Sequence, residues 1–99
     1  ELGYTVHLIY FWLNSPQLAV DRVAERVSKG GHNIPYEVIL RRYSKGIDNL
    51  FKLFMREVDI WAIYDNSQYK RERIAFGGKS IETKINDINN FKIIKGYVK

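Results

Sequence analysis

The sequence predicts a single α/β domain, and three observations support this. Two segments rich in β-branched and aromatic residues, 5–13 and 58–65, are typical of strands. The segment between them has helical periodicity, and a helical crossover favours parallel pairing of the strands that it joins. A chain of 99 residues can bury roughly 65% of its unfolded surface, enough for one modest core. We therefore expect residues 1–99 to form one domain around a parallel strand pair.

The first strand, residues 5–13, is apolar at almost every position. Such a run predicts burial of both faces, as in parallel sheets. On this interpretation His7 is a hydrogen-bonded core histidine, and the strand aromatics are core residues. The chain also starts at Glu1, without Met, and enters this strand almost at once, so we expect it to be a fragment of a larger protein.

A helix is predicted over residues 16–29. Ser15 can cap its first N–H groups, and Pro16 suits the first helical position because its missing N–H is not needed there. The apolar residues of this helix repeat at helical spacing on one face, and basic residues share another face. The apolar set is Val20, Val23, Ala24 and Val27, and the basic set is Arg22, Arg26 and Lys29.

A diglycine hinge, Gly30-Gly31, predicts the end of this helix because glycine readily adopts positive φ. Pro35 is expected to open a second helix, capped by Asn33, that runs to about residue 55. Gly46 is a position where this helix is expected to bend or break. The apolar stripe of the second helix consists of Ile39, Tyr43, Ile47, Leu50 and Phe54.

After the second strand, segments 74–76 and 81–85 predict a β-hairpin across Gly77-Gly78, and Asn86-Asp87 predicts the cap of a last helix. The tripeptide Gly78-Lys79-Ser80 is similar to the end of a phosphate loop. That motif needs a glycine five residues before Gly78, where Arg73 stands, and a helix rather than a strand afterwards. A hairpin turn is the better interpretation.

The formal net charge is +5, with six Lys/Arg against three acids in residues 21–45 and eight against three in residues 70–99. This distribution suits a polyanionic partner such as a nucleotide or nucleic acid. The absence of cysteine excludes disulfides and thiolate chemistry, and the longest apolar run is too short to span a bilayer. We expect a cytoplasmic protein without membrane association.

Arg22, Arg26 and Arg42 are the candidate phosphate ligands, because guanidinium groups bind phosphate oxygens in a planar fork. The alternative is that they lie on solvated helix faces with pairs such as Glu25–Lys29, and this alternative is preferred for Arg41 and Lys45. His32, in the loop, could donate to a phosphate. The sequence predicts neither a nucleophilic triad nor a metal site. Tyr43 and Tyr69, if exposed beside arginine, are the candidates for base stacking.

The order of these motifs resembles the C-terminal half of the zeta-toxin-like P-loop kinases, also described as predicted ABC-type ATPases. The resemblance covers about residues 3–95, and its specific part runs from Gly30-Gly31-His32 to Arg41-Arg42-Tyr43. It implies a partial P-loop-kinase-like parallel sheet with a helical lid hairpin, followed by the C-terminal β-hairpin and helix. Characterised zeta toxins phosphorylate a UDP-amino sugar with ATP and Mg²⁺.

The resemblance also implies roles for individual residues. Arg22 would lie near the adenine or triphosphate, Arg26 and Arg42 would reach phosphates, His32 would lie at the lid tip, and Asn66 would line the adenine edge. The phosphate loop, the catalytic base and the Mg²⁺-binding Asp of the family have no counterpart here, so the chain would be inactive without an N-terminal P-loop half. The alternatives are a basic nucleic-acid-binding module and an interaction piece of a toxin–antitoxin system, with an antitoxin as partner. We also expect a homodimer that extends the sheet or buries Ile9, Phe11 and Trp12.

Overall fold

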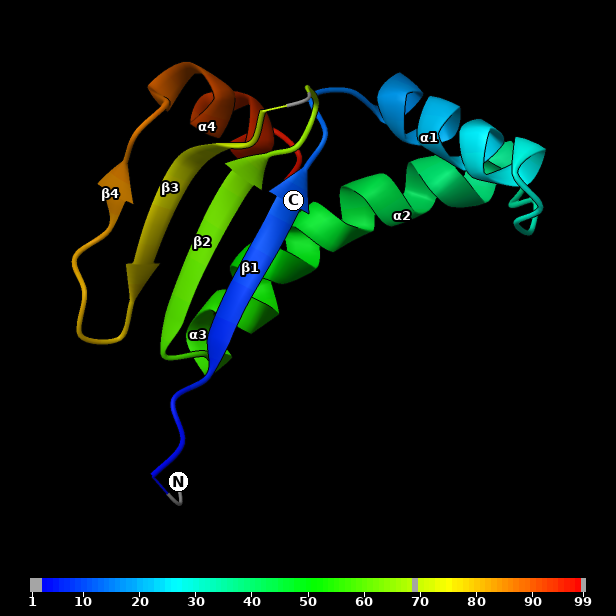
Figure 1. The fold of residues 1–99 in the computed structure, drawn as a ribbon. Coiled ribbons are helices and arrows are strands. Elements are labelled where there is room, and N and C mark those ends of the chain that lie inside the picture. Colours follow the sequence, from blue (N-terminus) through cyan, green and yellow to red (C-terminus); the bar gives the residue numbers. More distant parts are fainter. Residues whose placement is uncertain (1–2, 69, 99) are drawn as a thin grey trace.

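The chain forms a mixed four-stranded sheet with helices packed on one face, an α/β fold (Figure 1). The computed structural model describes residues 3–68 and 70–98. Its strands are β1 (His7–Trp12), β2 (Ile60–Asp65), β3 (Glu72–Gly78) and β4 (Lys84–Ile85). Its helices are α1 (Pro16–Ser28), α2 (Tyr36–Asn49), the π-helical turn η1 (Leu50–Phe54), α3 (Met55–Glu57) and α4 (Ile88–Lys95).

The strand order is β1-β2-β3-β4. Strands β1 and β2 are parallel, with His7 opposite Ile60 and Trp12 opposite Asp65. The β2–β3 and β3–β4 pairs are antiparallel. The predicted parallel pair and the predicted C-terminal hairpin are thus confirmed, but the sheet as a whole is mixed, because only β1 and β2 are joined by a helical connection.

The hairpin turns later than predicted: Gly77 and Gly78 are the last residues of β3, and β4 begins only at Lys84. Gly78-Lys79-Ser80 therefore spans the end of β3 and the start of the connection to β4, and a strand rather than a helix follows it. The N–H of Gly78 donates to the carbonyl of Ile81 at 3.2 Å, and Lys79 donates to the carbonyl of Asp59 at 3.1 Å. A Cβ at position 78 would lie only 2.2 Å from the Asp59 carbonyl oxygen. This glycine is therefore explained by close backbone packing rather than by phosphate binding.

The hydrophobic core lies between the sheet and the helices behind it in Figure 1. Among the described residues, no helix covers the opposite face of the sheet. The prediction that the first strand is buried on both faces is therefore wrong. Its outward residues His7, Ile9 and Phe11 are exposed, so His7 is not a core histidine. The buried core consists of Trp12, Ile47, Leu50, Val58, Trp61, Ile63, Ile74, Ala75 and Ile94.

The start of α1 is as predicted, whereas the start of α2 is not. The Ser15 hydroxyl accepts a hydrogen bond from the N–H of Leu18 at 3.2 Å, and Pro16 is the first helical residue. Pro35 occupies the cap position of α2 instead of the first turn, and no side chain caps this helix. Asn33 is thus not a cap, because it lies two residues before the cap position. Asp87 caps α4 by accepting from the N–H of Asn90 at 3.1 Å.

The π-helical turn η1 changes which side chains reach the core. The N–H of Met55 donates to the carbonyl of Leu50, five residues back, so one extra residue is accommodated in the turn. As a result Phe51 and Met55 pack against the core, and Phe54, predicted to be core, is 47% exposed. The predicted break at Gly46 does not occur. No helix in the described part of the chain is long and apolar enough to cross a membrane.

Candidate phosphate-binding site

The candidate site lies where β1 and β2 end. Parallel strands place their carboxyl ends at one edge of a sheet, and open α/β sheets generally bind ligands there. The loop after β2 is fastened to the end of β1, since the N–H of Asn66 donates to the Trp12 carbonyl at 2.7 Å. The N–H of Asn14 also donates to the hydroxyl of Ser67 at 2.8 Å. The two strand ends therefore form one connected edge.

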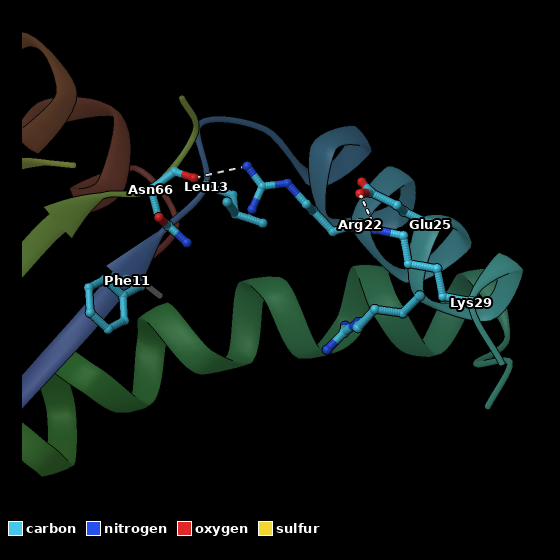
Figure 2. A pocket seen from close by; sticks show the side chains of 7 residues that line it. Phe11, Leu13, Arg22, Glu25, Lys29 and Asn66 are labelled. Atoms are coloured by element: carbon cyan, nitrogen blue, oxygen red, sulfur yellow. Dashed lines mark hydrogen bonds and ion pairs between the residues drawn. The ribbon is translucent and has the colours of Figure 1, made fainter. Parts of the chain in front are cut away.

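Arg22 joins α1 to this edge. Its guanidinium donates to the carbonyl of Asn66 at 3.0 Å and to that of Ser67 at 3.3 Å. Figure 2 shows the Arg22 side chain reaching from α1 toward Asn66 and Leu13. Some of the N–H donors of Arg22 are thus already hydrogen-bonded to the backbone of the chain itself. This arginine fixes the position of α1 relative to the carboxyl ends of the strands.

A cavity of about 350 Å³ opens beside Arg22. Its lining contains three basic side chains and one acidic side chain, so its local charge is positive. Glu25 and Lys29 form an exposed ion pair at 3.4 Å, which contributes little stability. The lining consists of Phe11, Leu13, Arg22, Glu25, Arg26, Lys29 and Asn66, and Figure 2 shows their arrangement.

A neighbouring cavity of about 260 Å³ lies between α1 and α2. It is mainly apolar, but Arg22, Arg26 and Arg42 all line it. In the part of the chain that the structure describes, the guanidinium groups of Arg26 and Arg42 have no hydrogen-bond or ion-pair partner. Arg22 and Arg26 therefore line both cavities, and two of the three arginines are available to an anionic ligand.

The diglycine hinge brings Arg42 toward α1. Gly30 has φ of +97°, which only glycine adopts without strain, and the N–H of Gly31 donates to the Arg26 carbonyl at 2.8 Å. A Cβ on Gly31 would lie 2.9 Å from that carbonyl oxygen. Both glycines thus let the chain turn tightly after α1, so that α2 returns alongside it (Figure 1).

Tyr43 is a packing residue rather than a stacking platform. It is half-buried, its ring meets that of Tyr97 edge-on at 5.3 Å, and its hydroxyl donates to the Leu13 carbonyl. Burial, reinforced by Tyr97, raises the pKa of Tyr43 above its ordinary value. Tyr43 thus belongs to the apolar stripe of α2, as predicted, and does not meet the condition of exposure that base stacking required. Tyr69, the other stacking candidate, lies outside the described residues.

The structure does not bring His32 into either cavity. His32 is exposed in the connection between α1 and α2. Arg41 is also exposed, and with Lys45 and Asp48 it lines a separate hollow on α2. Among the described residues, no group of three or more His, Asp or Glu side chains could hold a metal ion.

Four lining residues of the larger cavity were not predicted from the sequence. Phe11 was assigned to the core, and Leu13 carried no polar signal. Glu25 was interpreted only as the surface partner of Lys29, and that pair is present. Lys29 was placed on the basic face of the helix but not among the candidate phosphate ligands. These four residues could have been found only from their places in the fold. Phe11 and Leu13 lie at the end of β1, and Glu25 and Lys29 lie one turn apart on α1.

Comparison with protein-family models, with curated proteins and with solved structures finds no match.

Proposed function

We propose that this chain supplies the phosphate-binding arm of an ATP-dependent small-molecule kinase of the zeta-toxin-like type. The observation that carries the proposal is the convergence of Arg22, Arg26 and Arg42, from two helices, on adjoining cavities at the carboxyl ends of parallel strands. The motif order from Gly30-Gly31 to Arg42 supports the same assignment.

The donor chemistry of the site fits a polyphosphate. Guanidinium groups stay charged at all physiological pH values and form two parallel hydrogen bonds to phosphate oxygens. Arg26 and Arg42 would bind the phosphates, while Arg22 holds α1 in place through the carbonyls after β2. The Asn66 side-chain oxygen accepts from Nε of Arg71 at 3.1 Å, which orients the amide so that its NH₂ group can donate to a purine edge.

ATP would supply the transferred phosphoryl group, and the role of this chain's arginines is to bind and orient it and to stabilise its charge. The sequence holds no phosphate loop and no base, so catalysis would require residues beyond these 99. The chain alone is therefore expected to bind ATP only in the millimolar range, because a few arginines give a fraction of the ~8 kcal/mol that micromolar affinity needs.

Titration of the chain with ATP, and with inorganic tripolyphosphate, followed by NMR, tests the proposal. Millimolar binding of both ligands is expected, with shifts at Arg26 and Arg42 and a several-fold loss of affinity in Arg26→Ala and Arg42→Ala. Arg41→Ala is the matched control, because Arg41 is an exposed arginine of the same helix as Arg42 and lines neither cavity. Equal losses in all three variants would contradict the site. So would the absence of binding at about 10 mM ligand, a concentration at which a site of millimolar affinity is mostly occupied.

A further inference from the structure

The face of the sheet opposite α2 and α4 carries a second set of features, distinct from the cavities. Register defines its residues, because directly paired residues of neighbouring strands lie on the same face. Ile9 is opposite Ala62, which is opposite Phe76, and Phe11 is opposite Tyr64, which is opposite Arg73. We call this surface the open face. Its register-paired members are His7, Ile9, Phe11, Ile60, Ala62, Tyr64, Arg73, Phe76, Gly78 and Lys84.

Aromatic rings from three adjacent strands lie on the open face. Phe11 is 46% exposed, and its ring centroid lies 6.1 Å from that of Tyr64. Tyr64 and Phe76, on β2 and β3, are half-buried. A large contiguous apolar patch on the surface of a domain commonly marks a contact with a ligand or partner. Neighbouring aromatic rings on one face of a sheet are suited to planar ligands.

The cations on the open face are placed against these rings. The guanidinium carbon of Arg73 lies 4.2 Å from the centre of the Phe76 ring, and that of Arg71 lies 4.9 Å from the centre of Phe11. Lys84 is paired with Phe76 on the same face. Among the described residues that register assigns to this face, none is a carboxylate. The open face therefore combines aromatic and basic side chains, and its register-paired members include no acidic side chain.

Arg73 reaches this face because of a β-bulge. The register between β2 and β3 shifts after Ile63, so that Ala75 is opposite Ile63 but Arg73 is opposite Tyr64. Ile74, the extra residue, is buried in the core. Without the bulge, strand alternation would place Ile74 opposite Tyr64 on the open face and turn Arg73 away.

We propose that the open face binds single-stranded RNA, with bases stacked on Tyr64 and on the guanidinium groups that lie over Phe11 and Phe76. The phosphates are contacted by the outer N–H groups of Arg71 and Arg73 and by Lys84. Aromatic platforms flanked by cations match the alternation of flat bases and phosphates in a single strand. A second copy of the chain fits less well, because a two-fold face-to-face contact would bring the guanidinium groups of the two copies together. RNA is favoured over DNA because RNA commonly contains single-stranded loops and bulges, whose bases are free to stack on a protein surface.

This inference goes beyond the proposed nucleotide-phosphate site and does not depend on it. Tyr64, Phe76, Arg73 and Lys84 line neither cavity at the strand ends. Phe11 lines the larger cavity as well, and Arg71 donates to Asn66 of that cavity, so neither residue is used as a test position.

The test measures the fluorescence anisotropy of a labelled oligouridine of about 12 nucleotides, a length within the range of site sizes of single-strand-binding domains. The DNA oligomer of matching sequence and a duplex RNA are the further arms. Single-stranded RNA is expected to bind most tightly, and three phosphate contacts predict a slope of log K against log salt of about −2. Phe76→Ala and Tyr64→Ala are each expected to weaken binding roughly tenfold. Arg73→Lys, which keeps the charge but loses the planar group, should retain the salt slope and lose affinity.

Controls separate this site from folding defects and from the phosphate site. Phe54→Ala truncates an exposed phenylalanine outside the open face, and Arg41→Ala removes an exposed arginine of α2, so both should bind RNA as the parent does. Circular dichroism confirms that each variant is folded. Arg26→Ala should weaken tripolyphosphate binding but not RNA binding. Equal affinity of the folded Phe76→Ala variant and its parent, tighter binding of duplex RNA, or a two-copy species that Phe76→Ala dissociates would overturn the proposal.

Discussion

Tyr43 joins α2 to the end of β1, and its hydroxyl is the group that makes this connection specific. Tyr43→Phe keeps the ring, and hence its contact with Tyr97, but removes the hydrogen bond to the Leu13 carbonyl. We expect the free energy of unfolding to fall by about 1 kcal/mol, the typical net value of one hydrogen bond. Urea denaturation measures the change. Tyr36→Phe, at an exposed tyrosine of the same helix, should leave stability unchanged.

The Tyr43→Phe variant should also change how the stability of the fold depends on pH. Burial raises the pKa of Tyr43 in the folded chain above its unfolded value near 10, so folding favours the protonated hydroxyl. This stabilisation is complete below the unfolded pKa and is lost as pH rises above 10 toward the folded pKa. Tyr43→Phe should therefore lose less stability than the parent between about pH 9 and pH 11. A parallel decline in the two proteins would show that Tyr43 ionisation is not linked to folding.

Single residues with a local chemical role were the most predictable part of the molecule. The Ser15 cap and the Gly30-Gly31 turn depend only on the nearby backbone, so the sequence contains the relevant information. His7 and Tyr43 could not be assigned in this way, because their surroundings are contributed by segments far away in the chain. At the candidate site, Arg22 illustrates both cases: its position on α1 was predictable, but its bonds to the carbonyls 44 and 45 residues away were not.

At the scale of one element, the π-helical turn η1 is equivalent to one residue inserted in a continuous helix. Deleting the exposed Leu53 should therefore convert the turn to α-helix while both flanks keep their packing. We expect the deletion variant to unfold cooperatively within about 1 kcal/mol of the parent, since only an exposed side chain and one irregular turn are removed. Circular dichroism and thermal unfolding measure helix content and cooperativity.

Deletion of Lys45, in the regular part of α2, is the matched control. It should rotate the following turn by about 100° and withdraw Ile47 and Leu50, both fully buried, from the core. That variant should lose cooperative unfolding. Similar behaviour of the two deletions would mean that the π-helical turn contributes to stability in a way that a one-residue insertion does not explain.

The elements themselves were largely predictable, and the faces that they bury were not. Two strands, the crossover helices, the hairpin and the last helix all follow from periodicity and turn residues. Phe54 was assigned to the core because regular α-helical spacing was assumed, and η1 shifts that spacing. In β1 both alternating sets are apolar, so the sequence could not show that one set faces the core and the other forms the open face.

At the scale of the whole molecule, the chain exposes more surface than its mass predicts. Its accessible surface is 7209 Å² and its radius of gyration 14.8 Å. A compact monomer of this size would have about 5,900 Å² and a radius of gyration of about 12.6 Å. The excess reflects the open face and the α1–α2 pair, which extends beyond the sheet in Figure 1. An excess of roughly 1,300 Å² exceeds the ~800 Å² that each partner buries in a typical interface.

The predicted homodimer must be revised in the light of this fold. Trp12 is 1% exposed within its own chain, so it cannot be buried between copies. The arginines of the open face disfavour a face-to-face contact. The outer edge of β1 remains as the candidate for pairing, because β1 is the first strand in the sheet order and β2 is its neighbour on the other side. Long, apolar edge strands are templates for pairing with another chain.

We therefore expect two copies to pair antiparallel along β1, which extends the sheet and leaves both open faces accessible. The carbonyls of Val6 and Trp12 accept hydrogen bonds from the chain at the two ends of β2. In a parallel strand the backbone groups of alternate residues point to opposite edges, so the N–H of Ile9 points to the unpaired edge of β1. Ile9→Pro removes that donor and should give a species of 11.7 kDa in light scattering at micromolar concentration, against twice that mass for the parent. Ile9→Ala, which keeps the N–H, should still pair. A monomeric parent, or dimers that tolerate Ile9→Pro while remaining folded, would exclude pairing through this edge.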